Sequence, residues 1–339
     1  MYIANATGCS SIWGNSSPST PYTTNAKGQG PAWANSLFED NAEFGYGMLL
    51  AQRAIRDGLK AKVEAVVAEG KDEAVKEAGQ EWLDTFSVGA TNGAATDKLI
   101  AALEACGCDA AKEILAQKNY LSKKSQWIFG GDGWAYDIGF GGVDHVLASG
   151  RDINVMVFDT EVYSNTGGQS SKSTPTGAIA QFAAGGKETK KKDMASIAMS
   201  YGYVYVAQIS MGADFNQTVK AIAEAEAYPG PSLIIAYAPC INHGIKKGMA
   251  KAQTEEELAV KCGYWHNFRF NPAADKKFAL DSKTPDMENY MDFLNGEVRY
   301  NSLQRQNPEK AARLFAKNES EAKARYEYLN KLVAMYGEE

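Results

Sequence analysis

Residues 127–133 read Trp-Ile-Phe-Gly-Gly-Asp-Gly, an apolar run that ends in glycines around one acidic residue. Its apolar run predicts a buried strand, its glycines predict a tight turn, and a helix-like segment follows that ends near Ser149 and Gly150. The same alternation continues along the chain, with strands expected at residues 153–158, 203–209 and 233–236 and helices at residues 192–201 and 214–228. Apolar strands that alternate with helices predict an α/β fold, in which a mostly parallel sheet carries helices on both faces.

The segments around this sheet have a different composition. The first 30 residues are rich in small polar residues and lack helical periodicity, and residues 16–24 are expected to form an irregular loop. Ala, Glu, Lys and Leu then dominate three stretches with helical spacing, at residues 34–59, 61–82 and 96–117. We therefore expect a single domain over residues 1–339, with a helical insertion at about residues 50–122 and a C-terminal helical extension at about residues 290–339.

Composition excludes several classes of function. A formal net charge of −6 disfavours binding to nucleic acids or to anionic membrane surfaces, which attract basic proteins. No stretch approaches the roughly 18 apolar residues of a membrane-spanning helix, and residues 1–9 do not resemble an export signal. The five cysteines are scattered and odd in number, which is not typical of a disulfide framework. We expect a cytoplasmic protein that binds neither nucleic acid nor membrane.

Two polar clusters follow the first two strands of the predicted sheet, where parallel sheets bind their ligands. Asp132 lies between two glycines, which let backbone N–H groups approach an anion, and residues 159–169 are dense in oxygen ligands and amide donors. The 28 positions from Asp132 to Thr160 match one βαβ crossover, which would bring both side chains and a nearby carbonyl to one Mg²⁺. Taken alone, Gly-Asp-Gly also fits an ordinary strand-to-helix turn.

Together the two clusters resemble the thiamin diphosphate signature, in which Gly-Asp-Gly is followed one crossover later by an Asn-bearing loop. Thr160 stands where many members have Asn, and it keeps an oxygen ligand. The resemblance extends over most of the chain. Further strings similar to those of pyruvate:ferredoxin oxidoreductases, in the same order, lie at residues 6–14, 18–22, 30–41, 165–169 and 238–244.

The resemblance implies a role for each matching residue. Asp132 and Thr160 would ligate Mg²⁺ through their side chains and Val162 through its carbonyl. Asn165 would be the catalytic residue at the thiazolium end of thiamin diphosphate, and Phe38 would pack beside the aminopyrimidine. The full set of residues implied to contact the cofactor is Gly8, Cys9, Ser10, Phe38, Gly131, Asp132, Gly133, Thr160, Val162, Ser164, Asn165 and Thr166.

The resemblance also implies an iron–sulfur cluster. Cys9 and Cys240 correspond to two of the four ligands of a [4Fe–4S] cluster. In the family the other two form a Cys-x-x-Cys pair upstream of the position of Met1, so we expect a cluster only if that pair is supplied, because a cubane takes four ligands. Cys106 and Cys108 do not match the family's ligands and are expected to be free thiols.

Other charged and polar side chains are expected to have structural roles. Lys187 and residues 190–192 form a basic cluster that could attract phosphates or an acidic partner, but such runs are usually solvated faces. His145, His243 and His266 are expected to be structural, although His243 lies close to Cys240 in sequence and could donate to a cluster sulfur.

The function that the resemblance implies is that of an enzyme, pyruvate:ferredoxin oxidoreductase. Such an enzyme decarboxylates pyruvate oxidatively to acetyl-CoA and CO₂ and passes electrons through iron–sulfur clusters to ferredoxin or flavodoxin. We expect this chain to need N-terminal domains or subunits of the same oxidoreductase, to form a homodimer in the intact enzyme, and to be inactive alone. Two alternatives stay open: a free-standing thiamin-diphosphate-binding or assembly module without turnover, and a cluster-free thiamin-dependent decarboxylase, in which Cys9 and Cys240 would have no role.

Overall fold

A computed structural model describes residues 1–14 and 24–337 of the chain, so most of the loop expected at residues 16–24 lies outside the described residues. The chain divides into two compact units. One comprises residues 45–126 with Met1 and Tyr2, and the other comprises residues 3–44 and 127–339. No helix in the described ranges is both long and apolar enough to cross a membrane.

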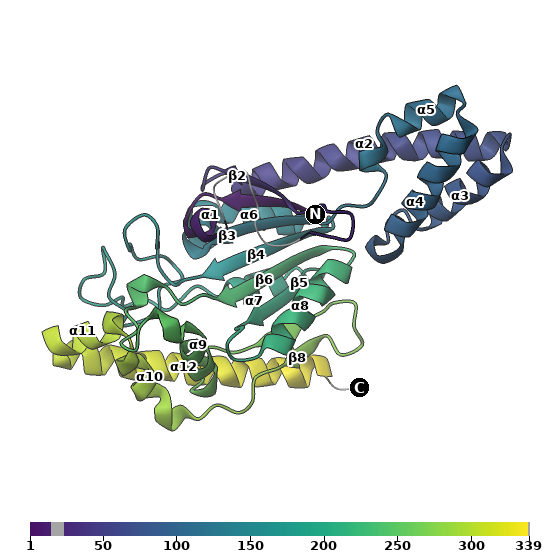
Figure 1. Ribbon diagram of the computed structural model, residues 1–339. Helices are drawn as coiled ribbons and strands as arrows, with labels where there is room; N and C mark the ends of the chain where they lie inside the picture. Colours follow the sequence, from purple (N-terminus) through teal and green to yellow (C-terminus); the bar gives the residue numbers. More distant parts are fainter. Residues whose placement is uncertain (15–23, 338–339) are drawn as a thin grey trace. The chain divides into compact units, whose positions relative to one another are not determined.

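The larger unit is built on a mixed sheet whose described strands lie in the order β2-β1-β3-β4-β6-β5-β7-β8 (Figure 1). The strands are β1 (Tyr2–Ala6), β2 (Ala32–Ser36), β3 (Gln126–Gly131), β4 (Ile153–Asp159), β5 (Tyr205–Ile209), β6 (Pro231–Tyr237), β7 (Phe268–Phe270) and β8 (Phe278–Leu280). The central strands β3, β4, β6 and β5 pair in parallel, whereas β7 and β8 extend the edge in antiparallel pairing. The predicted α/β fold with a mostly parallel sheet is confirmed.

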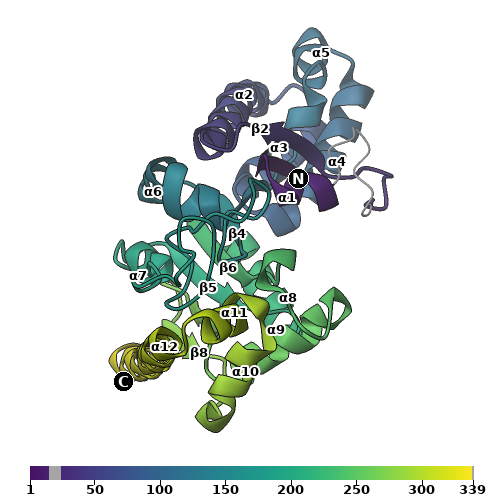
Figure 2. The same ribbon diagram turned by 90° about the vertical axis from the view of Figure 1, so that its left-hand side faces the viewer.

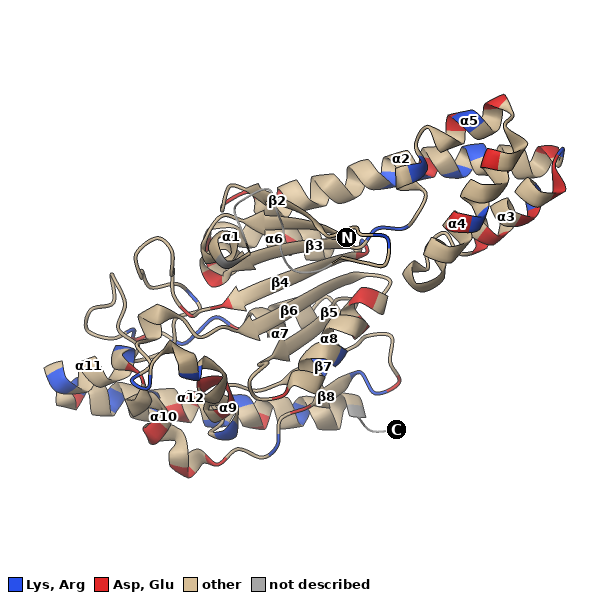
Figure 3. Ribbon diagram, in the orientation of Figure 1, with Lys and Arg blue, Asp and Glu red and all other residues tan. Residues whose placement is uncertain are grey.

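Helices cover both faces of this sheet, and the strands are apolar for that reason. Helices α6 (Phe140–Ala148) and α7 (Met194–Met199) lie on one face, and α8 (Phe215–Ala227) lies on the other (Figure 2). On the α8 side, Tyr205, Ile234 and Ala221 belong to one buried cluster. The central strands carry few charged residues, in contrast to the surrounding helices (Figure 3).

The remaining helices of the larger unit come from the first residues of the chain and from its C-terminal part. A short helix, α1 (Cys9–Trp13), follows β1 directly. The C-terminal part contributes α9 (Ala252–Lys261), α10 (Tyr290–Gly296), α11 (Val298–Gln306) and α12 (Pro308–Gly337). The sequence predicted helix at the C-terminal end, and the structure places three helices there.

The smaller unit is helical and has its own core. It contains most of α2 (Asn41–Glu69), together with α3 (Glu73–Asp84), α4 (Gly89–Cys106) and α5 (Asp109–Leu115). Trp82 is fully buried and donates its indole N–H to the carbonyl of Leu121 at 3.2 Å. Arg56 donates to the carbonyls of Phe86 and Leu121, at 3.0 and 3.2 Å, and so ties the loops between the helices to α2. The prediction of one domain with a helical insertion at residues 50–122 stays a prediction.

The structure corrects several local expectations. The helices expected at residues 61–82 and 96–117 are each interrupted, because α2 ends at Glu69 and α4 ends at Cys106. Residues 34–36 belong to strand β2 rather than to a helix, which begins at Asn41. The reason is tertiary, because the amide of Thr7 donates to the carbonyl of Ser36 at 3.2 Å and Asn35 accepts from the buried Asn5 at 2.9 Å. Strand β1 and helix α1 within the first 30 residues were not predicted, and neither was the antiparallel pair β7 and β8.

Candidate cofactor site

A cavity of about 590 Å³ opens beyond the carboxyl ends of β1, β3, β4 and β6. Every residue for which the resemblance implies contact with the cofactor lines it. They are Gly8, Cys9, Ser10, Phe38, Gly131, Asp132, Gly133, Thr160, Val162, Ser164, Asn165 and Thr166, and Cys240 lines it as well. Residues as far apart in sequence as Gly8 and Ala238, which are separated by 230 positions, therefore meet at one edge of the sheet.

The turn after β3 needs glycine because another chain segment approaches it closely. A Cβ atom at Gly133 would lie only 2.5 Å from the ring of Tyr163. Tyr163 in turn packs edge to face against Phe38, with ring centroids 6.0 Å apart. The Gly-Asp-Gly turn and the loop after β4 are thus fitted to each other.

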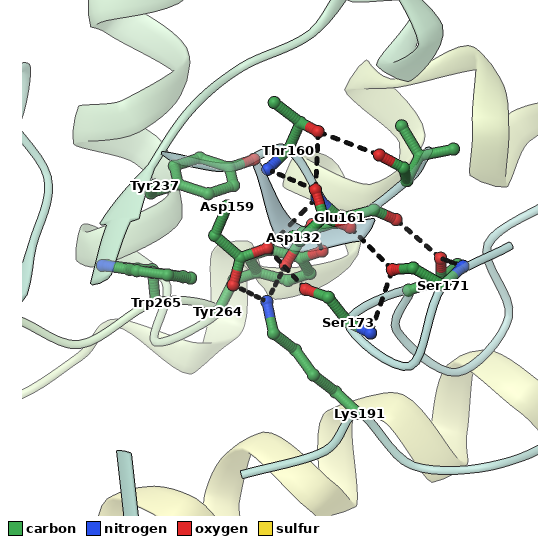
Figure 4. Close-up of polar contacts among 12 residues, drawn as sticks. Asp132, Asp159, Thr160, Glu161, Ser171, Ser173, Lys191, Tyr237, Tyr264 and Trp265 are labelled. Carbon is green, nitrogen blue, oxygen red and sulfur yellow. Dashed lines mark hydrogen bonds and ion pairs between the residues drawn. The ribbon is translucent and has the colours of Figure 1, made fainter. Parts of the chain in front are cut away.

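Three oxygen atoms converge beside this turn (Figure 4). The Thr160 hydroxyl lies 2.7 Å from Oδ1 of Asp132 and 3.0 Å from the carbonyl oxygen of Val162. A hydroxyl has one proton and can donate to only one of these two acceptors at a time. A small cation bound by all three oxygens would satisfy them together, and hard divalent ions prefer such ligands. The arrangement therefore fits Mg²⁺.

Asp132 also fits a cation because of its burial. Its side chain is only 1% exposed, and within the described part of the chain no Lys or Arg pairs with it. Its other contacts are the backbone N–H of Thr160, which donates to Oδ1 at 3.2 Å, and the hydroxyl of Ser171, which donates to Oδ2 at 2.6 Å. Burial, followed by repulsion from Asp159, raises the pKa of Asp132 to about 7. A divalent ion at the three oxygens would favour the ionised carboxylate of Asp132 and so offset the cost of burying its charge.

A network of buried charges lies behind the three oxygens. Lys191 bridges the carboxylates of Asp159 and Glu161, each at 2.8 Å (Figure 4). Arg299 pairs with Glu161 at 2.8 Å and with Glu297 at 2.6 Å. Burial would raise the pKa of Glu161, but Lys191 and Arg299 lower it to about 2. We call these five residues the buried charge network.

Glu161 has an unusual backbone conformation within this network. Its φ of 58° lies in the left-handed region, which side chains other than glycine rarely adopt. The carboxylate accepts a hydrogen bond from Tyr264 at 2.5 Å in addition to its ion pairs. The backbone is held too, since its N–H donates to Asp159 at 3.1 Å and its carbonyl accepts from Thr174 at 2.7 Å. The residue between Thr160 and Val162 is therefore fixed on all sides.

His243 contacts the backbone of the same loop. Its Nε2 lies 2.6 Å from the carbonyl oxygen of Thr160, and because a carbonyl can only accept, Nε2 carries the proton. The ring is fully buried, and burial lowers the pKa of His243 to about 3, so the ring is neutral. The expectation of a structural histidine agrees with these contacts.

Cys9 and Cys240 meet at one hydroxyl group. The oxygen of Ser164 lies 3.3 Å from the sulfur of Cys9 and 2.8 Å from that of Cys240. The backbone N–H of Asn242 points to the Cys240 sulfur at 3.4 Å, a contact that suits a thiolate. The two predicted cluster ligands are thus neighbours at the cavity. Within residues 1–14 and 24–337, no group of three or more His, Cys, Asp or Glu side chains is placed to hold a metal.

The loop after β4 presents Ser164, Asn165 and Thr166 at its tip. The amide of Tyr163 donates to the carbonyl of Gln169 at 2.9 Å, and the amide of Gly168 donates back to Tyr163 at 2.8 Å. This closes a small hairpin in which Asn165 and Thr166 are exposed. Asn165 therefore has room to meet a ligand in the cavity, as its predicted role requires.

Sequence reasoning missed the buried charge network and misjudged the basic cluster. Lys191 is partly buried and paired, Lys187 donates to two backbone carbonyls, and Lys192 lies 3.0 Å from the ring centroid of Phe140. Only Lys190 of the four is exposed, so the interpretation as a solvated face is wrong for the other three. Two acidic residues, Asp159 and Glu161, flank Thr160 and indicate that cationic partners are needed. The sequence does not indicate which lysine or arginine residues these partners are.

The mostly parallel sheet, the cavity beyond its strand ends and the three convergent oxygens define an α/β domain with a candidate ligand site at the carboxyl ends of its strands. Comparison with known proteins indicates a family for this domain. Residues 86–236 match the family model described as thiamine pyrophosphate enzyme, C-terminal TPP binding domain.

Three of the relatives that align with 98% of this chain illustrate the family. Pyruvate-flavodoxin oxidoreductase of Klebsiella pneumoniae is 56% identical and pyruvate:ferredoxin oxidoreductase of Moorella thermoacetica is 57% identical, and the chain spans 29% of the length of each. Mitochondrial pyruvate dehydrogenase [NADP(+)] of Euglena gracilis is 49% identical, and the chain spans 19% of it. The chain belongs with the thiamin-diphosphate-binding part of the pyruvate:ferredoxin and pyruvate-flavodoxin oxidoreductases, so the resemblance seen in the sequence is confirmed.

Proposed function

We propose that this chain holds thiamin diphosphate and Mg²⁺ for a pyruvate:ferredoxin or pyruvate-flavodoxin oxidoreductase. The observation that carries the proposal is the convergence of Asp132, Thr160 and the Val162 carbonyl at a buried point with no cationic partner within the described residues. When bound, thiamin diphosphate supplies the electron sink for decarboxylation of a 2-oxoacid. The chain's own part is to bind and orient it.

Each predicted contact has a physical task in this proposal. The three oxygens would hold Mg²⁺, and the ion would hold the diphosphate, since Mg²⁺ usually combines one or two protein groups with phosphate oxygens. Gly131 and Thr166 would lie along the diphosphate. Phe38 would pack against the aminopyrimidine, and Asn165 would face the reacting thiazolium end.

Cys9 and Cys240 support a role in electron transfer. We propose that they provide two of the four ligands of a [4Fe–4S] cluster and that another segment or subunit of the enzyme provides the other two. A cluster-free decarboxylase would leave their meeting at Ser164 without a purpose. This contact favours the oxidoreductase over that alternative.

The whole reaction is proposed from the relatives' names. Pyruvate would be oxidised to acetyl-CoA and CO₂, with coenzyme A and ferredoxin or flavodoxin as partners, in a cytoplasmic homodimer completed by N-terminal domains or subunits. The relative from Euglena gracilis is named for NADP⁺ and is still 49% identical here. The choice of electron acceptor is therefore assigned to parts of the enzyme outside this chain.

The proposal is tested by calorimetric titration with thiamin diphosphate, with and without Mg²⁺. Binding is expected to require Mg²⁺, to be lost in Asp132→Asn, which keeps the shape but not the charge, and to weaken in Thr160→Val but not in Thr160→Ser. Ser171→Ala is the matched control, because it removes a hydrogen bond to Asp132 and leaves the three oxygens in place. Should the folded chain bind nothing, even when it is co-expressed with the rest of the enzyme, the proposal is wrong. Binding without turnover in that complete enzyme would favour the assembly module.

A further inference from the structure

A pair of cysteines lies outside the cofactor cavity, in the helical unit of residues 45–126. Cys106 is the last residue of α4, and Cys108 directly precedes α5. Gly107 between them adopts a left-handed conformation with a φ of 60°, which ends α4 and turns the chain sharply. The two sulfur atoms are 2.8 Å apart, and the thiol of Cys106 donates to the sulfur of Cys108.

The other three cysteines have different surroundings. Cys262 is 2% exposed, and burial raises its pKa to about 12, so its thiol is unreactive. Cys9 and Cys240 contact Ser164 at the cavity. In contrast, Cys108 is exposed and Cys106 is partly exposed. Of the five cysteines, this pair alone combines access to solvent with direct contact between sulfur atoms.

We propose that Cys106 and Cys108 form a reversible intramolecular disulfide by exchange with small-molecule disulfides such as oxidised glutathione. The sulfur atoms are already in contact, and Gly107 permits the left-handed turn that brings them together at little conformational cost. The inference is independent of the proposed function, because neither residue lines the cofactor cavity.

The chemistry proceeds in two balanced steps. The thiolate of Cys108 attacks one sulfur of the small disulfide, so that a mixed disulfide forms and one small thiol leaves. The sulfur of Cys106 then attacks Cys108, which forms the internal disulfide and releases the second small thiol. The protein loses two protons and two electrons, and the small disulfide is reduced to two thiols.

The local hydrogen bond suits Cys108 to the first step and Cys106 to the second. Donation from Cys106 lowers the pKa of Cys108, whereas the same hydrogen bond raises the pKa of Cys106. The more acidic thiol is also the more exposed one, and the thiolate is the attacking species. The closeness of Cys106 means that the mixed disulfide is resolved within the same chain.

The test is thiol mapping of the purified chain, and of the complete enzyme, after equilibration in glutathione buffers of increasing oxidation. Both cysteines fall in one tryptic peptide, residues 99–112, which is expected to escape alkylation and to become about 2 Da lighter than its reduced form. Dithiothreitol is expected to restore both thiols. Thermal unfolding checks that the protein stays folded throughout.

Two variants separate the roles of the pair. Cys106→Ser is expected to stop at the mixed disulfide on Cys108, heavier by about 305 Da, and Cys108→Ser is expected to form no internal disulfide. Cys262→Ser is the matched control and should behave as the parent protein. The proposal is overturned if the parent peptide keeps both thiols in oxidised buffer, if it accumulates the mixed disulfide, or if it forms disulfides only between chains.

Discussion

Glu161 combines an unfavourable backbone conformation with strong side-chain contacts. Left-handed backbone costs an L-residue about 1 kcal/mol or more. Two ion pairs and a tyrosine hydroxyl offset that cost. The result is a loop in which the neighbouring Thr160 hydroxyl contacts both Asp132 and the Val162 carbonyl. The contacts of Glu161 thus act on the candidate cation site through the backbone.

Replacement of Glu161 by alanine and by glycine tests this coupling. Both substitutions remove the carboxylate, but only glycine adopts a φ of 58° without strain. We expect Mg²⁺-dependent binding of thiamin diphosphate to be about fivefold tighter in Glu161→Gly than in Glu161→Ala, which corresponds to about 1 kcal/mol.

The comparison is made by titration calorimetry on the complete enzyme, with circular dichroism to verify folding. If the carboxylate acts only as a buried charge, the two variants will bind equally weakly. If both bind as well as the parent protein, Glu161 has no influence on the site.

The sequence could not reveal the partners of such residues. Arg299 lies 138 positions from Glu161, and nothing in the local pattern of either residue indicates that they meet. The ligand positions themselves were predictable, because Asp132 and Thr160 each follow a strand of recognisable length and the crossover between them has a regular size. Motifs of local geometry can be read from one sequence, whereas ion pairs between distant segments cannot.

At the scale of elements, α12 is fixed to the sheet-bearing unit by buried polar contacts. Asn318 donates to the carbonyl of Thr176 at 2.6 Å, and Glu321 accepts from the Thr176 hydroxyl at 2.7 Å. Tyr326 on the same helix stacks on His266, with ring centroids 5.7 Å apart. His266 is 2% exposed, and neither ring nitrogen has a hydrogen-bond partner within the described residues.

This packing predicts a specific loss of stability in acid. Burial, with a smaller contribution from Arg325, lowers the pKa of His266 from 6.5 to about 4. Between these values the unfolded chain binds a proton that the folded chain does not, so stability present above pH 6.5 is lost as the pH falls. The free energy of unfolding of the parent protein should fall as the pH changes from 7 to 5. In His266→Phe, which keeps the stacking, this fall should be smaller by about 2 kcal/mol.

Urea unfolding at the two pH values measures this difference. His145→Gln, at an exposed histidine, is measured in parallel to show the effect of removing a histidine from the surface. Equal losses in the parent protein and His266→Phe would mean that His266 titrates normally in the folded state.

Elements were predictable where their patterns were long. The strands β4 and β6 carry apolar runs that are buried on both faces, and α12 keeps an amphipathic pattern over 30 residues. The strands β7 and β8 have three residues each, too few for a period to appear. Residues 34–36 of strand β2 lie at the start of a stretch whose composition favours a helix, and the pairing of β2 beside β1 overrides that preference.

At the scale of the whole molecule, the helical unit and the cofactor cavity are built from separate residues. Every residue that lines the cavity belongs to the larger unit, whereas the cluster around Trp82 belongs to residues 45–126. A substitution that destabilises the core around Trp82 should therefore leave the cofactor cavity intact.

Trp82→Ala provides the corresponding prediction. Removal of a fully buried tryptophan should destabilise the helical unit by about 3–5 kcal/mol. Hydrogen exchange followed by mass spectrometry is expected to speed up in peptides from residues 45–126, and to stay unchanged at residues 131–133 and 160–166. Faster exchange at the cavity would show that the two units unfold as one.

The position of β1 beside β3 has a consequence for how the chain finds its fold. The two strands are neighbours in the sheet, yet the whole helical unit separates them in sequence. Their pairing closes a loop on the order of 100 residues, while β3 to β6 and the helices α2 to α5 form through shorter-range contacts. The rim that Gly8, Cys9 and Ser10 contribute to the cavity follows β1, so completion of the cofactor pocket requires this long-range encounter and cannot precede it.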